Sequence, residues 1–289
     1  SSYYTNNIGY VNSAGGFNNG NATNGYAVRP ALNLNLTSVL FASDAAAGSG
    51  KSNASEASVF TDFLASTETN QWKLTLTDST KTLGNATLLK NGTNYSVVYS
   101  GASTGANTYL SAIIVDKSTG DVLWYGKLKA LTAETDAAGQ TAAFQMPGGV
   151  TLGSNTVMQV FVETVAESQT GTDYASPVKE FTAAETVESI AVSGATTTYT
   201  AGETFVTEGV TVTATLSGGG TLSLPGWSFD YPTYVNKAND QKFHIDASES
   251  ENQAVKIKSG FVNALSQPVT YDLAVTVNGI GKTDTPTLS

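Results

Sequence analysis

The single histidine, His244, lies in the segment KFHID, where Asp246 follows two residues later on the same face of an expected strand. A histidine oriented by a carboxylate is the arrangement that a general base requires. Such a pair also needs a nucleophile and an oxyanion site, and no G-x-S-x-G segment or similar motif supplies them. We therefore interpret His244 as an exposed strand residue, and we predict no catalytic residues and no enzyme activity.

Two acidic segments have some features of a cation site. The segment DKSTGD at 116–121 begins like a calcium loop, but an EF-hand loop needs carboxylate or amide ligands at positions 3 and 5. Ser118 and Gly120 occupy these positions, so the match fails. A second acidic group, interpreted as a solvated loop, comprises Asp246, Glu249 and Glu251. We predict neither a metal site nor a cofactor.

Aromatic side chains in polar surroundings are the candidates for ligand binding. Flat rings stack on the apolar faces of sugars, while Asn or Asp side chains fix the hydroxyl groups. The competing interpretation places Trp227 in a core with Phe229 and uses the tyrosines to cap domain junctions. The candidate ligand-binding residues are Tyr10, Phe17, Trp227, Tyr231 and Tyr234.

Composition restricts the functional class. The 289 residues are 40% hydrophobic but only 13% charged, with a net charge of −10. Arg29 is the only arginine, so the clustered basic residues of a nucleic-acid interface are missing. Cysteine is absent, which excludes disulfides, thiolate metal sites and cysteine nucleophiles. No apolar run is long enough to span a membrane. These features favour an extracellular, secreted or surface-attached protein, which we expect to be monomeric.

The segment YLSAIIVDKSTGDVLWYGKLKAL at 109–131 is expected to be the centre of the fold. Two apolar runs flank a polar turn that contains a glycine, which is the pattern of a hairpin. Leu110, Ala112 and Ile114 fall on one face of the first run, and Ile113 and Val115 fall on the other. A strand that is apolar on both faces is usually covered on both faces, so we predict that this hairpin lies mid-sheet.

The remaining segments predict an all-β fold in which Ig-like or fibronectin-like β-sandwiches follow each other. Seven or eight short strands between 70 and 184, with turns every 8–12 residues, are typical of a sandwich. In WKLTLT the alternation puts Trp72, Leu74 and Leu76 on one face, and we expect Trp72 and Trp124 in the core. Leu32, Leu34 and Leu36 also alternate and predict a strand.

Other segments are expected to be irregular or to form the ends of the chain. Residues 42–58 are interpreted as a loop or linker, and 59–64 is the one helix candidate. The chain opens abruptly at SSYYTNN, which predicts a piece of a longer precursor. The predicted divisions are 1–69 as a small N-terminal β remnant with a linker, 70–184 as a β-sandwich and 185–289 as an Ig-like domain.

Three segments resemble modules of secreted and surface proteins of Gram-positive gut bacteria. GYAVRPALNLNLTSVLF resembles the end of a domain of unknown function that finishes with "VRPAL", and WKLTLTD with TDYASPVKEFT resembles the β-sandwich that follows it. VESIAVSGATTTYTAGETFVTEGVTVTATLSGG resembles bacterial Ig-like repeats, although the chain departs from them after Gly226. The resemblance implies a modular extracellular protein without established catalytic residues. It also implies that Lys–Asn isopeptide crosslinks occur in related surface modules; the strand lysines are Lys73, Lys127 and Lys256, and spacing selects no partner for them.

From these patterns we predict a non-enzymatic adhesion module whose partner is a host glycan or an extracellular protein. One alternative is a structural spacer that presents an upstream domain. Another is an accessory module of a secreted glycan-degrading enzyme. Fold alone rarely determines function, so the alternatives stay open at the level of sequence.

Overall fold

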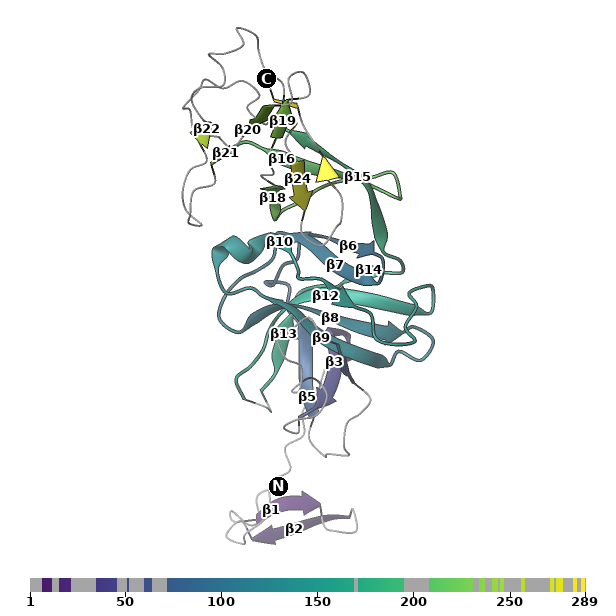
Figure 1. Cartoon of the computed structure of the whole chain (residues 1–289). Helices are drawn as coiled ribbons and strands as arrows, with labels where there is room; N and C mark the ends of the chain where they lie inside the picture. The colour runs from purple at the N-terminus through teal and green to yellow at the C-terminus, as the bar shows by residue number, and fades with distance from the viewer. Residues whose placement is uncertain are drawn as a thin grey trace. The chain divides into compact units, whose positions relative to one another are not determined.

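The computed structural model describes residues 7–11, 16–21, 35–45, 51, 60–63, 72–168, 171–194 and 208–230, together with short strands beyond 230. Side chains are described in these ranges except at 7–11, 17, 19 and from 227 onward. Contacts between Cα atoms divide the chain into two units, Ser1–Leu36 and Thr37–Ser289. Strands dominate both units and the described residues include no α-helix, so the predicted all-β class is confirmed (Figure 1).

The smaller unit is described through one hairpin. β1 (Asn7–Val11) pairs antiparallel with β2 (Phe17–Asn21), and Tyr10 lies opposite Asn18 in this register.

The larger unit contains the expected central hairpin. β8 (Thr108–Asp116) pairs with β9 (Val122–Ala130) on one side and with β12 (Thr156–Thr164) on the other. The sheet has the order β3-β5-β13-β12-β8-β9-β4, and β14 pairs with β12 beside this path. The other strands are β3 (Val39–Asp44), β4 (Thr61–Asp62), β5 (Trp72–Thr77), β13 (Asp173–Ala175) and β14 (Lys179–Phe181).

A second sheet has the order β10-β7-β6-β15-β16-β17, and β11 pairs with β7. Gly92, at φ +61°, adopts the left-handed conformation in the tight turn between β6 and β7, as the Asn-Gly pair predicts. The strands of this sheet are β6 (Asn85–Asn91), β7 (Asn94–Ser100), β10 (Gly139–Gln140), β11 (Phe144–Gln145), β15 (Glu185–Ser193), β16 (Thr211–Leu216) and β17 (Thr221–Ser223). A 3-10 turn at Glu134–Ala137 precedes β10.

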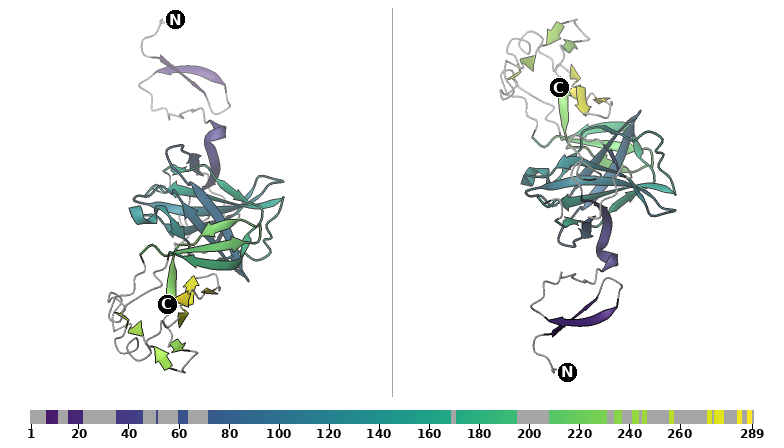
Figure 2. Two further views of the ribbon diagram at one scale, coloured as in Figure 1. Left: turned by 90° about the horizontal axis from the view of Figure 1, so that it is seen from above. Right: turned by 90° about the horizontal axis from the view of Figure 1, so that it is seen from below.

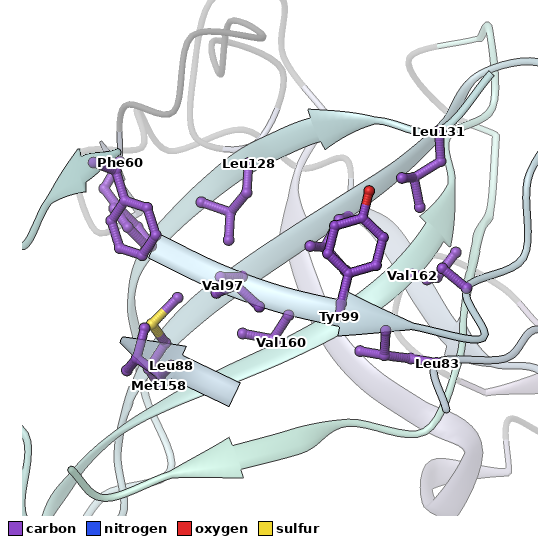
Figure 3. Packing of buried hydrophobic residues seen from close by; sticks show 14 of the residues in the cluster. Phe60, Leu83, Leu88, Val97, Tyr99, Leu128, Leu131, Met158, Val160 and Val162 are labelled. Atoms are coloured by element: carbon purple, nitrogen blue, oxygen red, sulfur yellow. The ribbon is translucent and has the colours of Figure 1, made fainter. Parts of the chain in front are cut away.

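The first core is formed by side chains from both sheets. Figure 3 shows Leu88 and Val97 from the second sheet beside Met158, Val160 and Leu128 from the first. These side chains are almost completely buried. Burial of each such apolar side chain contributes about 1.5–3 kcal/mol, so this contact between sheets stabilises the sandwich. Both views of Figure 2 show the blue and teal strands, which include those of both sheets, gathered in one body.

A second, smaller core covers the opposite face of the first sheet. Ile113 and Val115 of β8 contribute to it, whereas Leu110, Ala112 and Ile114 belong to the first core. The prediction of a mid-sheet hairpin buried on both faces is confirmed. The centroid of the Phe41 ring lies 6.0 Å from that of Phe161 and 6.2 Å from that of Tyr125, which are favourable separations for aromatic packing.

The helix expected at 59–64 is wrong. Thr61 and Asp62 form β4, which pairs with Tyr125 and Trp124 at the edge of β9. The Phe63 N–H donates to the Leu123 carbonyl oxygen at 2.9 Å. An open strand edge offers unpaired backbone groups, and pairing with it outweighs the weak helical tendency of one short segment.

The orientation expected for β5 is also wrong. Trp72 is 65% exposed, while Lys73 and Thr75, on the opposite face of the strand, are buried. Trp124 is partly buried against the first core, as expected. The alternating pattern correctly identified the strand, but the polar face points inward because it meets buried polar groups from other strands. This reversal positions the site described below.

The strand predicted from the alternation of Leu32, Leu34 and Leu36 is wrong at Leu36, the one of these residues that the structure describes. Leu36 is 75% exposed and lies in a 3-10 turn, Leu36–Ser38, before β3 begins at Val39. Leu32 and Leu34 lie outside the described residues. The expected linker at 42–58 is in part structured, because β3 continues to Asp44 and pairs with β5 as far as Trp72.

Beyond residue 226 the structure describes short strand pairs only. β15 (Glu185–Ser193) begins at the expected division at 184/185 and pairs through Glu185 and Thr186 with β6 and through its later residues with β16, so strand pairing joins the segments on the two sides of this division. The pairs are β18 (Trp227–Asp230) with β24 (Ala274–Val277), β19 (Tyr234–Asn236) with β20 (Gln241–Phe243), β21 (Ile245–Asp246) with β22 (Lys256–Ile257), β24 with β25 (Thr283–Asp284), and β23 (Tyr271–Asp272) with β26 (Thr287–Leu288).

Candidate functional site

The candidate aromatic residues lie outside the part of the chain whose side chains are described. The backbone places Tyr10 in β1, Phe17 in β2, Trp227 in β18 and Tyr234 in β19, and Tyr231 falls between described strands. The other predicted positions outside the described side chains are His244, Asp246, Glu249, Glu251 and Lys256. Their suggested roles stay predictions.

The segment at 116–121 is a tight turn between β8 and β9. One carboxylate oxygen of Asp116 accepts hydrogen bonds from the Ser118 N–H at 2.8 Å and the Ser118 hydroxyl at 2.6 Å. These bonds hold the pKa of Asp116 below its ordinary value. Among the described residues, no group of three histidine, aspartate or glutamate side chains is placed to hold a metal ion.

A cluster of four charged side chains lies beside the second core, and it is the strongest candidate site in the described structure. We call Lys51, Lys73, Glu163 and Asp173 the buried charge cluster. The Lys51 side chain is 3% exposed, and those of Glu163 and Asp173 are fully buried. Two positive and two negative groups balance each other, as buried charges must to avoid a large desolvation cost.

Four segments that are distant in sequence position this cluster. Lys73 comes from β5, Glu163 from the end of β12 and Asp173 from β13, while Lys51 follows β3. The strand register brings three of them together: Thr75 of β5 pairs with Asp173, and Ala175 pairs with Glu163. The side chains therefore share one face of the sheet, next to the Phe41 and Phe161 rings.

Lys51 is the centre of the cluster. Its Nζ donates to Asp173 Oδ2 at 2.7 Å, to Thr75 Oγ1 at 3.0 Å and to Glu163 Oε2. An ammonium group has three N–H donors, so all three are used within the protein. The Nζ atom also lies 5.0 Å from the centre of the Phe41 ring and 5.3 Å from that of Tyr125, within the range of cation–π attraction.

Asp173 has a different set of partners on each oxygen. Oδ2 faces Lys51, whereas Oδ1 accepts a hydrogen bond from the Ala166 N–H at 2.7 Å and lies 3.0 Å from Lys73 Nζ. Lys73 Nζ also contacts the backbone carbonyl oxygens of Ala166 and Ser168. One N–H and one ammonium group therefore converge on Oδ1, an arrangement that stabilises negative charge on this atom.

Glu163 links the cluster to Tyr125. The Tyr125 hydroxyl donates to Glu163 Oε1, and the Ser111 hydroxyl lies 3.5 Å from the tyrosine oxygen. Complete burial and the nearby Glu163 charge raise the pKa of Tyr125 well above its ordinary value. Tyr125 therefore stays a neutral donor at physiological pH, and each oxygen of Glu163 has a donor.

A small cavity adjoins the cluster. Its volume is about 170 Å³, and Lys51, Lys73 and Asp173 line it together with Lys127 and Glu167. The Lys127 ammonium also lies 4.6 Å from the centre of the Tyr109 ring. Lys51 and Asp173 use their polar groups on protein partners.

Sequence reasoning found only one member of the cluster, Lys73, among the strand lysines. Glu163 carried a signal, because it lies on the same face of its strand as Phe161 and directly follows three apolar residues at 160–162. Asp173 lies in a three-residue strand that the sequence analysis did not anticipate. Lys51 carried no local signal, since it lies in the Gly- and Ser-rich segment that was interpreted as a linker.

Comparisons with family models, with curated proteins and with solved structures find no match to this chain. No helix in the described part of the chain is long and apolar enough to cross a membrane. The function must therefore be inferred from the chemistry of the buried charge cluster and from the exposed surface.

A second buried polar group supports a prediction about alkaline pH. The hydroxyl of Tyr99 is buried at the edge of the first core without a hydrogen-bond partner in the described structure, and burial, with a smaller contribution from Asp136, raises its pKa to about 12. Above pH 10 the unfolded chain loses this proton while the folded chain keeps it. The stability that depends on Tyr99 is therefore present below pH 10 and is lost as the pH rises through 12.

Tyr99→Phe is expected to reduce this alkaline loss and to leave stability at pH 7 unchanged or raised by about 1 kcal/mol, because an unsatisfied buried hydroxyl is removed. Urea unfolding at pH 7 and at pH 11 measures both effects. A variant that is destabilised at pH 7 and retains the full alkaline loss would contradict the assignment.

Proposed function

We propose that this chain is a non-catalytic structural module of a secreted or cell-surface protein, which acts as a β-rich spacer between other parts of that protein. In this proposal the region from 185 onward is an Ig-like module that extends the spacer. The acidic composition without cysteine is compatible with an extracellular setting.

The buried charge cluster is the observation that carries this proposal. Its ammonium and carboxylate groups bind one another across four segments, and Lys51 has no remaining N–H donor for a substrate. A catalytic site needs groups that are free to meet a reacting molecule, whereas a spacer needs its strands fixed to each other. The cluster ties the β5 and β13 end of the sheet to the segment after β3, which suits the second role.

Single-molecule force spectroscopy tests the spacer. The chain, tethered at residues 37 and 194, is expected to resist extension up to a high force whether Lys51 and Asp173 are paired as ions or joined covalently, and Asp173→Ala is expected to lower that force because it leaves buried ammonium groups unpaired. Glu180→Ala, which breaks the exposed Lys117–Glu180 pair, is the matched control and is expected to leave the force unchanged. A wild-type chain that extends without a force peak would remove the proposal.

Adhesion is the second candidate, and the exposed face of β5 and β13 favours it. Trp72 is 65% exposed and Tyr174 is 46% exposed. Tyr174 pairs with Leu76, so both aromatic rings lie on the same face of the sheet as the half-buried Leu74 and Leu76. Exposed rings on a flat strand surface are suited to stacking on sugars.

A glycan and mucin array probed with the whole chain tests adhesion to a host glycan. Binding that is lost in Trp72→Ala and Tyr174→Ala would establish this face as the site. Binding that survives both changes would direct attention to Tyr10, Phe17, Trp227, Tyr231 and Tyr234. No binding at all would favour the spacer.

A further inference from the structure

We infer that the buried charge cluster forms a covalent bond: an amide between Lys51 Nζ and the carboxyl carbon of Asp173, assisted by Glu163. This inference concerns the chemistry of the folded chain and does not depend on whether the protein is a spacer or an adhesin.

The nucleophile and the carboxyl group are already in contact. Lys51 Nζ lies 2.7 Å from Asp173 Oδ2, and both side chains are removed from solvent. Groups that are held in contact by a folded chain react as if their concentration were many orders of magnitude above that in solution. The reaction of an amine with a carboxylic acid, which is slow between free molecules, is therefore strongly favoured here.

Glu163 is placed to move the protons. Its Oε2 contacts Lys51 Nζ, and its Oε1 accepts a hydrogen bond from Tyr125, which fixes the carboxylate toward the amine. A buried carboxylate in contact with the reacting nitrogen is a suitable general base, and once protonated it becomes a general acid.

Two positively polarised groups contact the other oxygen of Asp173, Oδ1, and can stabilise the transition state. The Ala166 N–H at 2.7 Å and the Lys73 ammonium at 3.0 Å both face Oδ1. Negative charge gathers on Oδ1 when the amine adds to the carbon, and these two groups stabilise that charge as an oxyanion hole does. Lys73 thus has a positioning role, and it contacts Asp173 on the oxygen that is retained.

The step balances in atoms and charge. Lys51 transfers one proton to Asp173 Oδ2, and the neutral amine then adds to the carboxyl carbon. Glu163 accepts a second proton from the nitrogen and returns it to the departing Oδ2 hydroxyl. The C–N bond forms, the C–Oδ2 bond breaks and water leaves, with no oxidant or reductant required. One positive and one negative charge disappear together, and Lys73 and Glu163 remain as a balanced pair.

Burial favours the amide over the ions. Two desolvated charges are replaced by a neutral group, which lowers the desolvation cost of the cluster. The cavity of about 170 Å³ that Asp173 lines gives the released water room to leave. The new bond would join residues 122 positions apart, enclosing β4 to β12 in one covalent ring.

Intact mass spectrometry of the folded, purified chain tests the inference. The wild type is expected to be about 18 Da lighter than its sequence mass, which corresponds to one water. Tryptic digestion with fragmentation is expected to find a branched peptide that joins Lys51 to Asp173, with no cleavage after Lys51.

Three variants identify the roles of the residues. Lys51→Arg keeps the charge but removes the nucleophilic amine, and Glu163→Gln removes the proton acceptor; both are expected at their full sequence masses. Lys117→Arg is the matched control, because Lys117 also binds a carboxylate, at 3.0 Å, but on the exposed surface. This control is expected to keep the loss of about 18 Da.

Several results would overturn the inference. A folded wild-type chain at its full mass shows that the cluster is ionic only. A mass loss confined to one linear peptide would indicate a cyclised aspartate instead of a crosslink. A branched peptide that contains Lys73 would show that Lys73, and not Lys51, is the nucleophile. A folded Lys51→Arg variant that keeps the loss would also exclude the bond; if that variant does not fold, the wild-type mass and the branched peptide still decide.

Discussion

Asp173→Ala is expected to lower the free energy of unfolding by about 3–5 kcal/mol, because it leaves Lys51 and Lys73 buried with only Glu163 to balance them. Where the Lys51–Asp173 amide has formed, the loss is larger, since closing a ring of this length contributes about 5 kcal/mol. Urea unfolding followed by tryptophan fluorescence and by circular dichroism measures the difference.

Two further variants separate charge balance from simple loss of packing. In the double variant Lys51→Met with Asp173→Ala, Lys73 and Glu163 remain as one positive and one negative group. This double variant is expected to be more stable than Asp173→Ala alone. Glu180→Ala at the exposed pair is expected to cost less than about 1 kcal/mol. An Asp173→Ala chain as stable as Glu180→Ala would contradict the described cluster.

Phe161→Ala is expected to cost about 3–5 kcal/mol, whereas Trp72→Ala is expected to change stability by less than about 1 kcal/mol. Phe161 is completely buried beside Phe41, and its removal leaves a cavity in the second core. Trp72 is the larger side chain and the sequence places it in the core, but 65% of its surface is exposed.

The pair of aromatic variants tests the orientation of β5 directly. If that strand faced the other way, Trp72→Ala would be the costly change. Thermal unfolding of both variants under one condition decides between the two orientations. Equal and large losses would contradict the position described for Trp72.

Much of the fold followed from local patterns. The hairpin at 109–131 was predicted with its turn and with both faces buried, because a strand apolar on both sides has only one favourable environment. The predicted turns every 8–12 residues were sufficient to separate most strands of the sandwich. The helix prediction at 59–64 failed, because the strand at Thr61–Asp62 is stabilised by pairing with the edge of β9, which the local sequence does not show.

The charged residues show most clearly the difference between what the sequence determined and what the tertiary structure determined. The sequence by itself determined an all-β chain with an apolar central hairpin, little surface charge and no cysteine chemistry. Only the tertiary structure decided that Lys51, Lys73, Glu163 and Asp173 meet, because they lie up to 122 residues apart and no spacing rule joins them. These contacts also explain why the polar face of β5 is buried. Lys73 and Thr75 find charged and hydrogen-bonding partners on other segments, and a strand buries the face that finds such partners.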